Sequence, residues 1–399
     1  MSAPATGTTE SEEIDRRALR SVAVQFFSNG ATYATIVPRL PEIREQVGVS
    51  IGTLGLVLTI GSLGGLVGTL LTGPVIARVG SRRVMVYGAT TSLAFLPIIG
   101  FTTSPAILAI ALFGLLFFDI FIDVAMNVQG SAISARRHTP VMNRLHGLWS
   151  LGSVAGGVVT VLTLRSDVST QVQLTVVAIA LIVTLRFMAP GLLHRDATPQ
   201  LGASAAAVAE RPHVGRFGFA TMLLASGGAT AMAIELTNGD WASFRLGDDL
   251  GASPGVAALA FLTFTAAMTV GRLGGDWVQV RVGSVQLMRI APVVIAVGCV
   301  LATLVPSVPV SLVGFFVGGI GCSVLFPQLY DRAARWPGPP GSGFASMLIG
   351  QRGMGIVTPF IVGGLANTAG LDVGQAMAIV VLPCAVIAFA TTFARREHD

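Results

Sequence analysis

The sequence predicts an all-α polytopic membrane protein, and three observations support that fold class. Hydrophobic residues make up 52% of the 399-residue chain and charged residues only 11%, whereas soluble domains usually carry roughly 25% charged residues. The mean hydropathy is +0.75. The apolar residues also form long runs, close to the roughly 20 residues that a membrane-spanning helix requires, without the alternating pattern of barrel strands.

Twelve such spans are expected, in two sets of six. They cover residues 20–38, 51–77, 84–102, 105–133, 145–164, 171–189, 217–238, 255–277, 287–305, 309–330, 343–366 and 374–393. A polar, Ala-rich connector separates the sixth span from the seventh. The expected organisation is a disordered cytoplasmic tail over 1–19, an N-terminal half over 20–189, a cytoplasmic linker over 190–216, a C-terminal half over 217–393 and a short cytoplasmic tail over 394–399.

The arginines test this topology, because cytoplasmic loops carry an excess of basic residues. The chain contains no lysine, and nineteen of its twenty-five arginines fall on the cytoplasmic side if the N-terminus is cytoplasmic. Four fall on the opposite side, namely Arg39, Arg44, Arg165 and Arg245. We therefore expect a multi-pass protein of the cytoplasmic (inner) membrane with both termini in the cytoplasm. The same bias accounts for the pI of 9.8, so no nucleic-acid partner is inferred.

Several other classes of protein are not expected. Residues 1–19 lack the apolar core of a cleaved signal peptide, and no phosphate-binding loop is present, which argues against direct ATP drive. The two G-x-S-x-G matches, GVSIG and GASPG, each open a predicted span, where Ser is a helix cap rather than a nucleophile. No enzyme activity and no cofactor are therefore expected. The cysteines lie in apolar spans, where thiols behave as small hydrophobes, so neither a disulfide nor a metal site is predicted; they are Cys299, Cys322 and Cys384.

A repeat connects the two halves. The tetrapeptide RVGS occurs at residues 78–81 and again at 281–284, an offset of 203 residues. At the same offset GVSIG at 48–52 aligns with GASPG at 251–255. Both pairs lie at equivalent places, one before and one after the second span of a half. The offset predicts a parallel repeat of two six-helix halves, an arrangement in which the substrate site lies between the halves near the midplane.

The segment from Gly73 to Arg83 resembles the loop signature of the major facilitator superfamily, in which a Gly and an Asp-Arg pair precede a Gly and basic residues. Ala77 and Ser81 depart from it. In the family this loop latches the halves together in one state. The resemblance implies a latch formed by Gly73, Arg78, Gly80, Arg82 and Arg83, with Arg272, Asp276, Arg281 and Gly283 in the second half. A simple i,i+4 ion pair between Arg272 and Asp276 is an equal alternative.

Further motifs resemble a bacterial branch of this superfamily that is related to the fucose permease-like proton symporters. They are DVAMNVQG at 123–130, VMNRLHGLWSLG at 141–152, Arg39-Leu-Pro41, and Glu235 ahead of Asp240-Trp241. The resemblance implies alternating access and a proton-carrying carboxylate in the fourth span. Two motifs of drug/proton antiporters are incomplete, because Met126 replaces an Arg and Ser153 replaces a Pro. Their absence favours uptake over export.

The candidate proton-coupling residues are acids inside spans, where an ionisable side chain is costly and is a functional-site hypothesis by default. Asp119, Asp123 and Asn127 recur every four residues, so they share one face of a helix. A buried carboxyl there could take a proton on one side and release it on the other. Glu235 is the third candidate. The alternative for each is a structural carboxylate bonded to an arginine or a helix terminus.

A mixed polar and aromatic pocket is expected to bind the substrate. Its candidate residues are Asn29, Tyr33, Asn127, His146, Trp149, Trp241, Gln328, Gln351 and Arg352. Arg352 lies inside the eleventh span, so it must face the interior. Structural alternatives remain for the others: Trp anchors at the membrane interface, Asn29 joins helices, and His146 caps a helix.

The sequence therefore predicts a proton-coupled secondary transporter of a small polar solute, with a sugar-like solute as one candidate. One alternative is a proton-antiport exporter of drug-like or amphiphilic compounds, and a more distant one is a non-transporting membrane sensor. The expected partners are the solute, protons and the lipid bilayer, and the expected state is a monomer.

Overall fold

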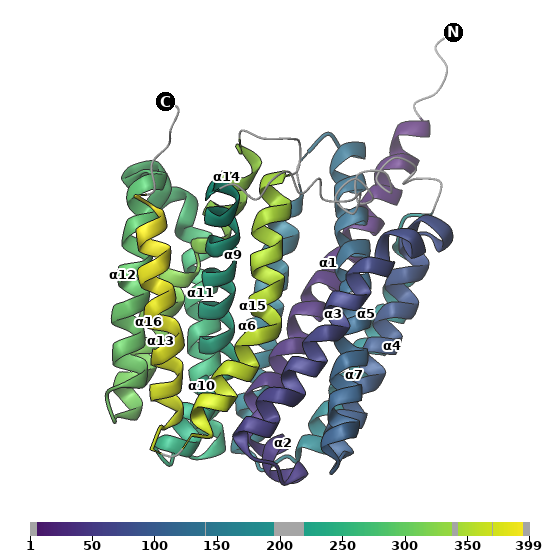
Figure 1. The fold of residues 1–399 in the computed structure, drawn as a ribbon. Helices are drawn as coiled ribbons and strands as arrows, with labels where there is room; N and C mark the ends of the chain where they lie inside the picture. Colours follow the sequence, from purple (N-terminus) through teal and green to yellow (C-terminus); the bar gives the residue numbers. More distant parts are fainter. Residues whose placement is uncertain (1–5, 140, 195–218, 337–341, 369, 394–399) are drawn as a thin grey trace.

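The computed structural model describes residues 6–139, 141–194, 219–336, 342–368 and 370–393, without the side chains of residues 6–11, 219, 220 and 276. Within these residues every regular element is a helix (Figure 1). The expected linker over 190–216 lies outside the described residues from 195 onward, as does the tail over 394–399.

The first half of the chain forms six long helices with a short helical segment after the first. Its elements are α1 (Thr6–Ile36), η1 (Val37–Arg39), α2 (Leu40–Val47), α3 (Ile51–Val79), α4 (Ser81–Phe101), α5 (Pro105–Arg136), α6 (Met142–Arg165), α7 (Thr170–Met188) and η2 (Ala189–Gly191). The second half repeats this plan. Its elements are α9 (Phe219–Asp240), α10 (Ala242–Phe244), η4 (Arg245–Asp249), α11 (Pro254–Val282), α12 (Ser284–Thr303), α13 (Val308–Cys322), α14 (Leu325–Ala334), α15 (Ser342–Ala366) and α16 (Val373–Thr391).

Ten spans of the described residues are long and apolar enough to cross a membrane, counting α13 and α14 as one. Helix α1 packs along α6, and helix α9 packs along α15. These two helices begin the two halves and complete the twelve-span fold that the sequence predicts. We call the end of the bundle where α1 begins and α16 ends the terminus side, and the opposite end, which carries α2 and α10, the α2 side (Figure 1).

The first helix begins earlier than expected. The sequence predicts a disordered tail over 1–19, but α1 starts at Thr6. Asp15 is buried in the bundle and accepts a hydrogen bond from Arg136 Nε at 2.6 Å. Ala18 is buried as well. This polar and apolar packing against α5 extends the helix beyond the apolar run from which the span was predicted.

The repeat is visible in the helix boundaries and in the backbone. Helices α3 and α11 begin and end at positions exactly 203 residues apart, and so do the first residues of α4 and α12. Gly80 has φ 85° and ψ 148°, and Gly283 has φ 84° and ψ 148°. This positive φ is readily adopted only by glycine, so the glycine of each RVGS copy is required where one helix ends and the next begins. The 203-residue offset is therefore a structural repeat.

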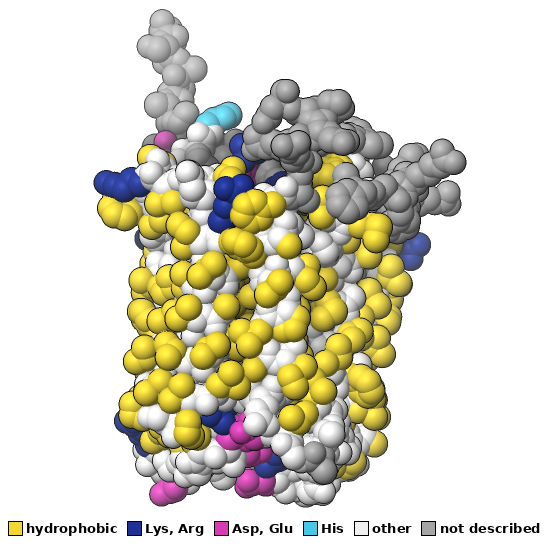
Figure 2. All heavy atoms as spheres, turned by 60° about the vertical axis from the view of Figure 1, so that its left-hand side comes forward, with side chains coloured by type: hydrophobic (Ala, Val, Ile, Leu, Met, Phe, Trp, Pro, Cys, Tyr) yellow, Lys and Arg dark blue, Asp and Glu magenta, His cyan; other side chains and the backbone are white. Residues whose placement is uncertain are grey.

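Apolar side chains cover the outside of the bundle. Figure 2 shows hydrophobic side chains across the middle of one face, with charged side chains towards its two ends. Among the described residues, Phe187 is 78% exposed and Val280 is 86% exposed. Large continuous apolar surfaces are rare on soluble monomers, so this belt indicates contact with lipid.

The two halves meet closely on the α2 side. Helix α3 contacts α15 there: a Cβ at Gly55 would lie 2.5 Å from the carbonyl oxygen of Pro359, and one at Gly52 would lie 2.9 Å from Asn367 Cβ. Helix α6 contacts α11, with Gly157 against Leu262. Small residues allow such close approach of helices. The bundle is thus closed between the halves on the α2 side.

Candidate functional site

The three polar residues predicted on one face of the fourth span lie near the middle of α5. Pro105 starts this helix at a position where a missing backbone N–H costs nothing. Asp119, Asp123 and Asn127 follow at successive turns, and all three are half-buried. Neither carboxylate forms a salt bridge within the described residues. An acid without a salt bridge at this depth is costly and therefore a candidate functional group.

Asp119 is held by a chain of hydrogen bonds that joins three helices. The side-chain amide of Asn29 on α1 donates to Asp119 Oδ1 at 2.6 Å. The indole N–H of Trp149 on α6 donates to Asn29 Oδ1 at 2.8 Å. The structure therefore brings together three residues that the sequence predicts separately as proton-coupling and substrate-binding groups.

Asp123 has a different set of neighbours. Asn127 Nδ2 donates to the Asp123 side chain at 3.2 Å and to its backbone carbonyl at 2.8 Å. His146 on α6 is exposed, lies close enough to Asp123 to interact electrostatically, and packs edge-on against Phe26 with ring centroids 5.3 Å apart. Asn127 is therefore bonded within its own helix.

The C-terminal half contributes positive charge and hydrogen-bond acceptors. Arg352 on α15 is near enough to both Asp119 and Asp123 to interact with them electrostatically, and it forms no direct salt bridge in the described structure. Next to it, Gln351 Oε1 is buried and has no hydrogen-bond partner. Burying an acceptor without a hydrogen-bond partner costs free energy. A donor group of a bound substrate would remove that cost by bonding to Gln351 Oε1.

Glu235 lies in the interior of the same half. Its carboxylate oxygen Oε2 is 3.5 Å from Arg272 Nη2 on α11, yet that oxygen is buried and makes no hydrogen bond. The ion pair links a residue predicted for proton coupling with one predicted for the latch. The side chain of Asp276, the other candidate partner of Arg272, lies outside the described part of the structure.

A hydrogen bond between Tyr33 and Asp240 crosses between the halves. Tyr33 on α1 donates to Asp240 Oδ1 at the end of α9, at 2.5 Å. Asp240 is buried and was not among the predicted site residues. One sequence feature pointed to Asp240, namely its place at the end of a span next to Trp241. The sequence did not indicate that Tyr33 of the other half is its partner.

Two predicted pocket residues lie elsewhere. Trp241 is completely buried on the α2 side and packs against Phe244 with ring centroids 5.4 Å apart. Gln328 is buried and donates to Gln279 Oε1 at 2.7 Å, and Gln279 donates in turn to Ser284 Oγ. In the first half, Gln129 donates to Ser81 Oγ at 3.0 Å. The equivalent serines Ser81 and Ser284 thus each accept from a glutamine, and Gln328 belongs to the buried hydrogen-bond link that joins α14, α11 and α12.

The residues predicted for the latch lie around the two equivalent turns on the terminus side. Arg82 Nη1 is 2.5 Å from His194 Nε2, and the Arg281 guanidinium lies 3.6 Å from the centroid of the Trp277 ring. Arg78 and Arg83 are exposed, and Gly73 directly precedes Pro74 inside α3.

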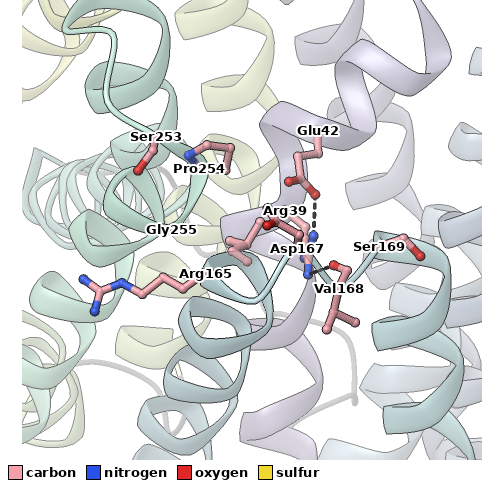
Figure 3. A pocket seen from close by; sticks show the side chains of 10 residues that line it. Arg39, Glu42, Arg165, Asp167, Val168, Ser169, Ser253, Pro254 and Gly255 are labelled. Carbon is pink, nitrogen blue, oxygen red and sulfur yellow. Dashed lines mark hydrogen bonds and ion pairs between the residues drawn. The ribbon is translucent and has the colours of Figure 1, made fainter.

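A cavity of about 370 Å³ lies between the halves on the α2 side, apart from the interior residues (Figure 3). In Figure 3 Arg39 bonds to Glu42 and to the Val168 carbonyl, while Arg165 extends towards the start of α11. The remaining lining comes from Leu164, Asp167, Ser169, Ser253, Pro254 and Gly255.

Two six-helix halves around an interior set of charged, amide and aromatic side chains define a membrane carrier. A family model described as the Major Facilitator Superfamily matches residues 22–236, more than half of the chain. The chain belongs to the Major Facilitator Superfamily, as its loop motif predicts. It is therefore a transporter and not an enzyme.

Two relatives are 30% identical to this chain. One is an uncharacterised transporter of Sinorhizobium fredii, matched over 88% of this chain and 91% of the relative. The other is an uncharacterised MFS-type transporter of Yersinia pestis, matched over 93% and 95%.

Solved structures share the fold at low identity. A bacterial homologue of the human lysosomal transporter Spinster, inward-facing and unoccupied, has a TM-score of 0.75 at 12% identity, over 95% of this chain and 97% of that one. The nucleoside transporter NupG has a TM-score of 0.72 at 16% identity, over 94% and 99%. The Escherichia coli fucose:proton symporter FucP has a TM-score of 0.61 at 14% identity, over 95% and 98%.

Proposed function

We propose that this transporter is a symporter that couples the movement of a small polar solute to protons by alternating access. The observation that supports it best is Asp119: a carboxylate in the middle of a span, bonded to an amide and without a salt bridge in the described residues. A carboxylate permanently paired with arginine could not exchange a proton easily, whereas this one can. Asp123, one turn away, and Glu235 are the further proton-coupling candidates.

The proposed orientation places the terminus side in the cytoplasm of a cell with an inner membrane. The positive-inside rule favours this orientation. On the α2 side, Arg39, Arg44 and Arg245 each form a salt bridge with an acid, Glu42, Asp248 and Asp249 respectively, so that side carries little net positive charge. With this orientation the contacts on the α2 side close the bundle towards the outside, and we propose that the solute exchanges with the cytoplasm in this conformation.

The chemistry of the interior suits a solute with an apolar face and several hydroxyl groups. The half-buried Trp149 ring provides a surface for stacking. Gln351 Oε1 and Glu235 Oε2 are acceptors that lack hydrogen bonds, and hydroxyl groups of a solute would supply the missing donors. The nucleoside and fucose carriers named above move solutes of this kind, and their shared fold supports the same class here.

The charges around the acids favour a solute without net charge. Asp119, Asp123, Glu235 and the buried Asp240 are four acids near two arginines, Arg352 and Arg272, so two bound protons leave the set neutral. Bringing a charged solute into this low-dielectric interior would add an uncompensated charge, which is expensive. We therefore propose that proton binding prepares the site for a neutral solute such as a sugar or a nucleoside.

Uptake into proteoliposomes under an imposed pH gradient tests the proposal. The probes are radiolabelled fucose, xylose and uridine, added to the wild type, Asp119→Asn, Asp123→Asn and Asp331→Asn. Asp331 is a matched control, because it pairs with Arg335 on the terminus side away from the interior. We expect gradient-driven accumulation in the wild type and control, and loss of accumulation above equilibrium in Asp119→Asn. Full accumulation in both interior variants would overturn proton coupling through these acids.

A further inference from the structure

The side-chain amide of Asn29 connects an acid to an aromatic ring. Its Nδ2 donates to Asp119 Oδ1 at 2.6 Å and its Oδ1 accepts from Trp149 Nε1 at 2.8 Å. The indole N–H can only donate and an ionised carboxylate can only accept. These two neighbours therefore fix the amide in one orientation, with its oxygen towards Trp149.

The backbone around this amide is rigid. A Cβ at Gly30 would lie 2.0 Å from the carbonyl oxygen of Trp149, so α1 and α6 are in direct backbone contact at this level. Ser153 Oγ lies 3.2 Å from the carbonyl oxygens of both Gly30 and Trp149. Neither helix can shift easily here, so a change at Asn29 must be taken up by side chains.

We propose that Asn29 is a positioning residue that transmits the protonation state of Asp119 to the indole of Trp149. The inference rests on the proposed proton coupling and adds the route by which the proton changes the solute site. The proton goes to Oδ1, the Asp119 oxygen that accepts from Asn29. Transfer from hydronium breaks one of its O–H bonds, releases water and turns Oδ1 into a donor, while Oδ2 can still accept. The Asn29 NH₂ group and the new O–H are then two donors that compete for the same contact.

A rotation of the Asn29 side-chain amide that exchanges the positions of Oδ1 and Nδ2 removes the competition between the two donors. The Asn29 oxygen then accepts from the Asp119 hydroxyl, and the NH₂ group faces the Trp149 N–H. Two donors now face each other, so Trp149 loses its hydrogen bond and its ring is free to reorient. No covalent bond other than the new O–H bond is made. Deprotonation reverses the sequence and holds the ring again.

Other charged groups face this unit and have to be separated from it. Asp123 lies one turn away on α5, Arg352 faces both acids from α15, and His146 on α6 lies beside Asp123. Tyr330 of α14 interacts with Asp123 and Arg352. His146 stands one turn before Trp149 on its own helix, so it is the main competing source of any pH response at the indole.

Tryptophan fluorescence as a function of pH, in nanodiscs and without solute, tests the relay. The chain has four tryptophans, so the Trp149 signal is obtained as the difference from Trp149→Phe, measured in each background. We expect one sigmoidal change of the difference emission in the wild type. It should be lost in Asp119→Asn and in Asn29→Leu, with the Asn29→Leu indole held at its low-pH emission at every pH.

Two controls sharpen the result. Asn127→Leu removes an amide bonded to Asp123 but not to Trp149, and it should keep the transition, as should His146→Gln. The relay is overturned if the wild type shows no transition, if the transition persists in either Asp119→Asn or Asn29→Leu, or if it disappears only in His146→Gln. Loss of gradient-driven uptake in Asp119→Asn alongside an unchanged indole transition would reject the relay while leaving proton coupling in place.

Discussion

At the scale of single residues, two buried arginines on the α2 side have several hydrogen-bond partners each. Arg39 is only 1% exposed and donates to Gln173 Oε1, Glu42 Oε2 and the Val168 carbonyl. It thereby joins the end of the first span to α7. In the second half, Arg245 is 2% exposed and donates to Asp249 and to the carbonyls of Ala302 and Val305. A buried guanidinium thus holds each half together on the α2 side.

Replacing Arg39 by Met should strongly destabilise the protein. Removing one partner of a buried charge pair typically costs about 3 to 5 kcal/mol, since the other polar groups stay buried and unpaired. The midpoint of thermal unfolding in detergent measures the effect. Arg165→Met is the matched control, because Arg165 is exposed on the same side and forms no salt bridge in the described residues. Equal midpoints for the two variants would show that the Arg39 bonds add little stability.

Only part of this residue-level picture could be predicted from the sequence. The four-residue spacing of Asp119, Asp123 and Asn127 placed them on one face, because helix geometry alone determines that. Asp240 was missed because its partner, Tyr33, is 207 positions away, and no local pattern encodes such a contact. Gln328 was assigned to the pocket for its polarity, which cannot distinguish a solute ligand from a buried link between helices.

At the scale of the elements, close packing of α1 on α6 depends on small residues. A Cβ at Gly152 would lie 2.0 Å from the carbonyl oxygen of Phe27, a distance no real contact allows. Gly147, on the same helix, has nothing within 4 Å of its ideal Cβ. The two glycines of one helix therefore differ completely in their surroundings.

This difference leads to opposite expectations for alanine substitutions. Gly152→Ala should lower stability by about 1 to 3 kcal/mol, the usual range for overpacking. Gly147→Ala should be neutral or stabilising, because alanine favours a helix over glycine by roughly 1 kcal/mol. Thermal unfolding of the two variants measures the contrast. A similar loss of stability in both would contradict tight packing of α6 against α1.

The elements were largely predictable because an apolar run of fixed length is a direct physical requirement of the bilayer. The residues at which the helices begin and end were less predictable. The span predicted over 309–330 is broken into α13 and α14 around Ser323 and Val324. Pro327 explains the break, because it lacks the N–H that would bond to the Ser323 carbonyl. Similarly, α1 extends beyond its apolar run because Asp15 is paired with Arg136, a tertiary contact that hydropathy does not record.

At the scale of the whole molecule, the sequence repeat predicts two equivalent halves but not how they are placed against each other. Both copies of the second span have the same length, so the repeat shows that the halves are equivalent. It contains no information about the side of the membrane on which the halves are in contact. The contacts on the α2 side decide this for the present conformation: Gly52 against Asn367, Gly55 against Pro359, and the salt bridge from Arg44 to Asp248. Alternating access requires these contacts to open in every cycle.

A disulfide across this contact tests that central claim most directly. The ideal Cβ of Gly52 lies 2.9 Å from Asn367 Cβ, so a Gly52→Cys, Asn367→Cys pair needs only a small adjustment to reach the roughly 3.8 Å of a normal disulfide. Cys299 and Cys322 are buried, and the two single variants control for reactions of the native thiols. The measurement is uptake of the fucose, xylose and uridine probes before oxidation, after oxidation and after reduction.

We expect oxidation to stop uptake in the double variant only, and reduction to restore it, because the crosslink prevents the halves from separating on the α2 side. Undiminished uptake by a fully crosslinked protein would contradict transport by alternate opening of these two halves.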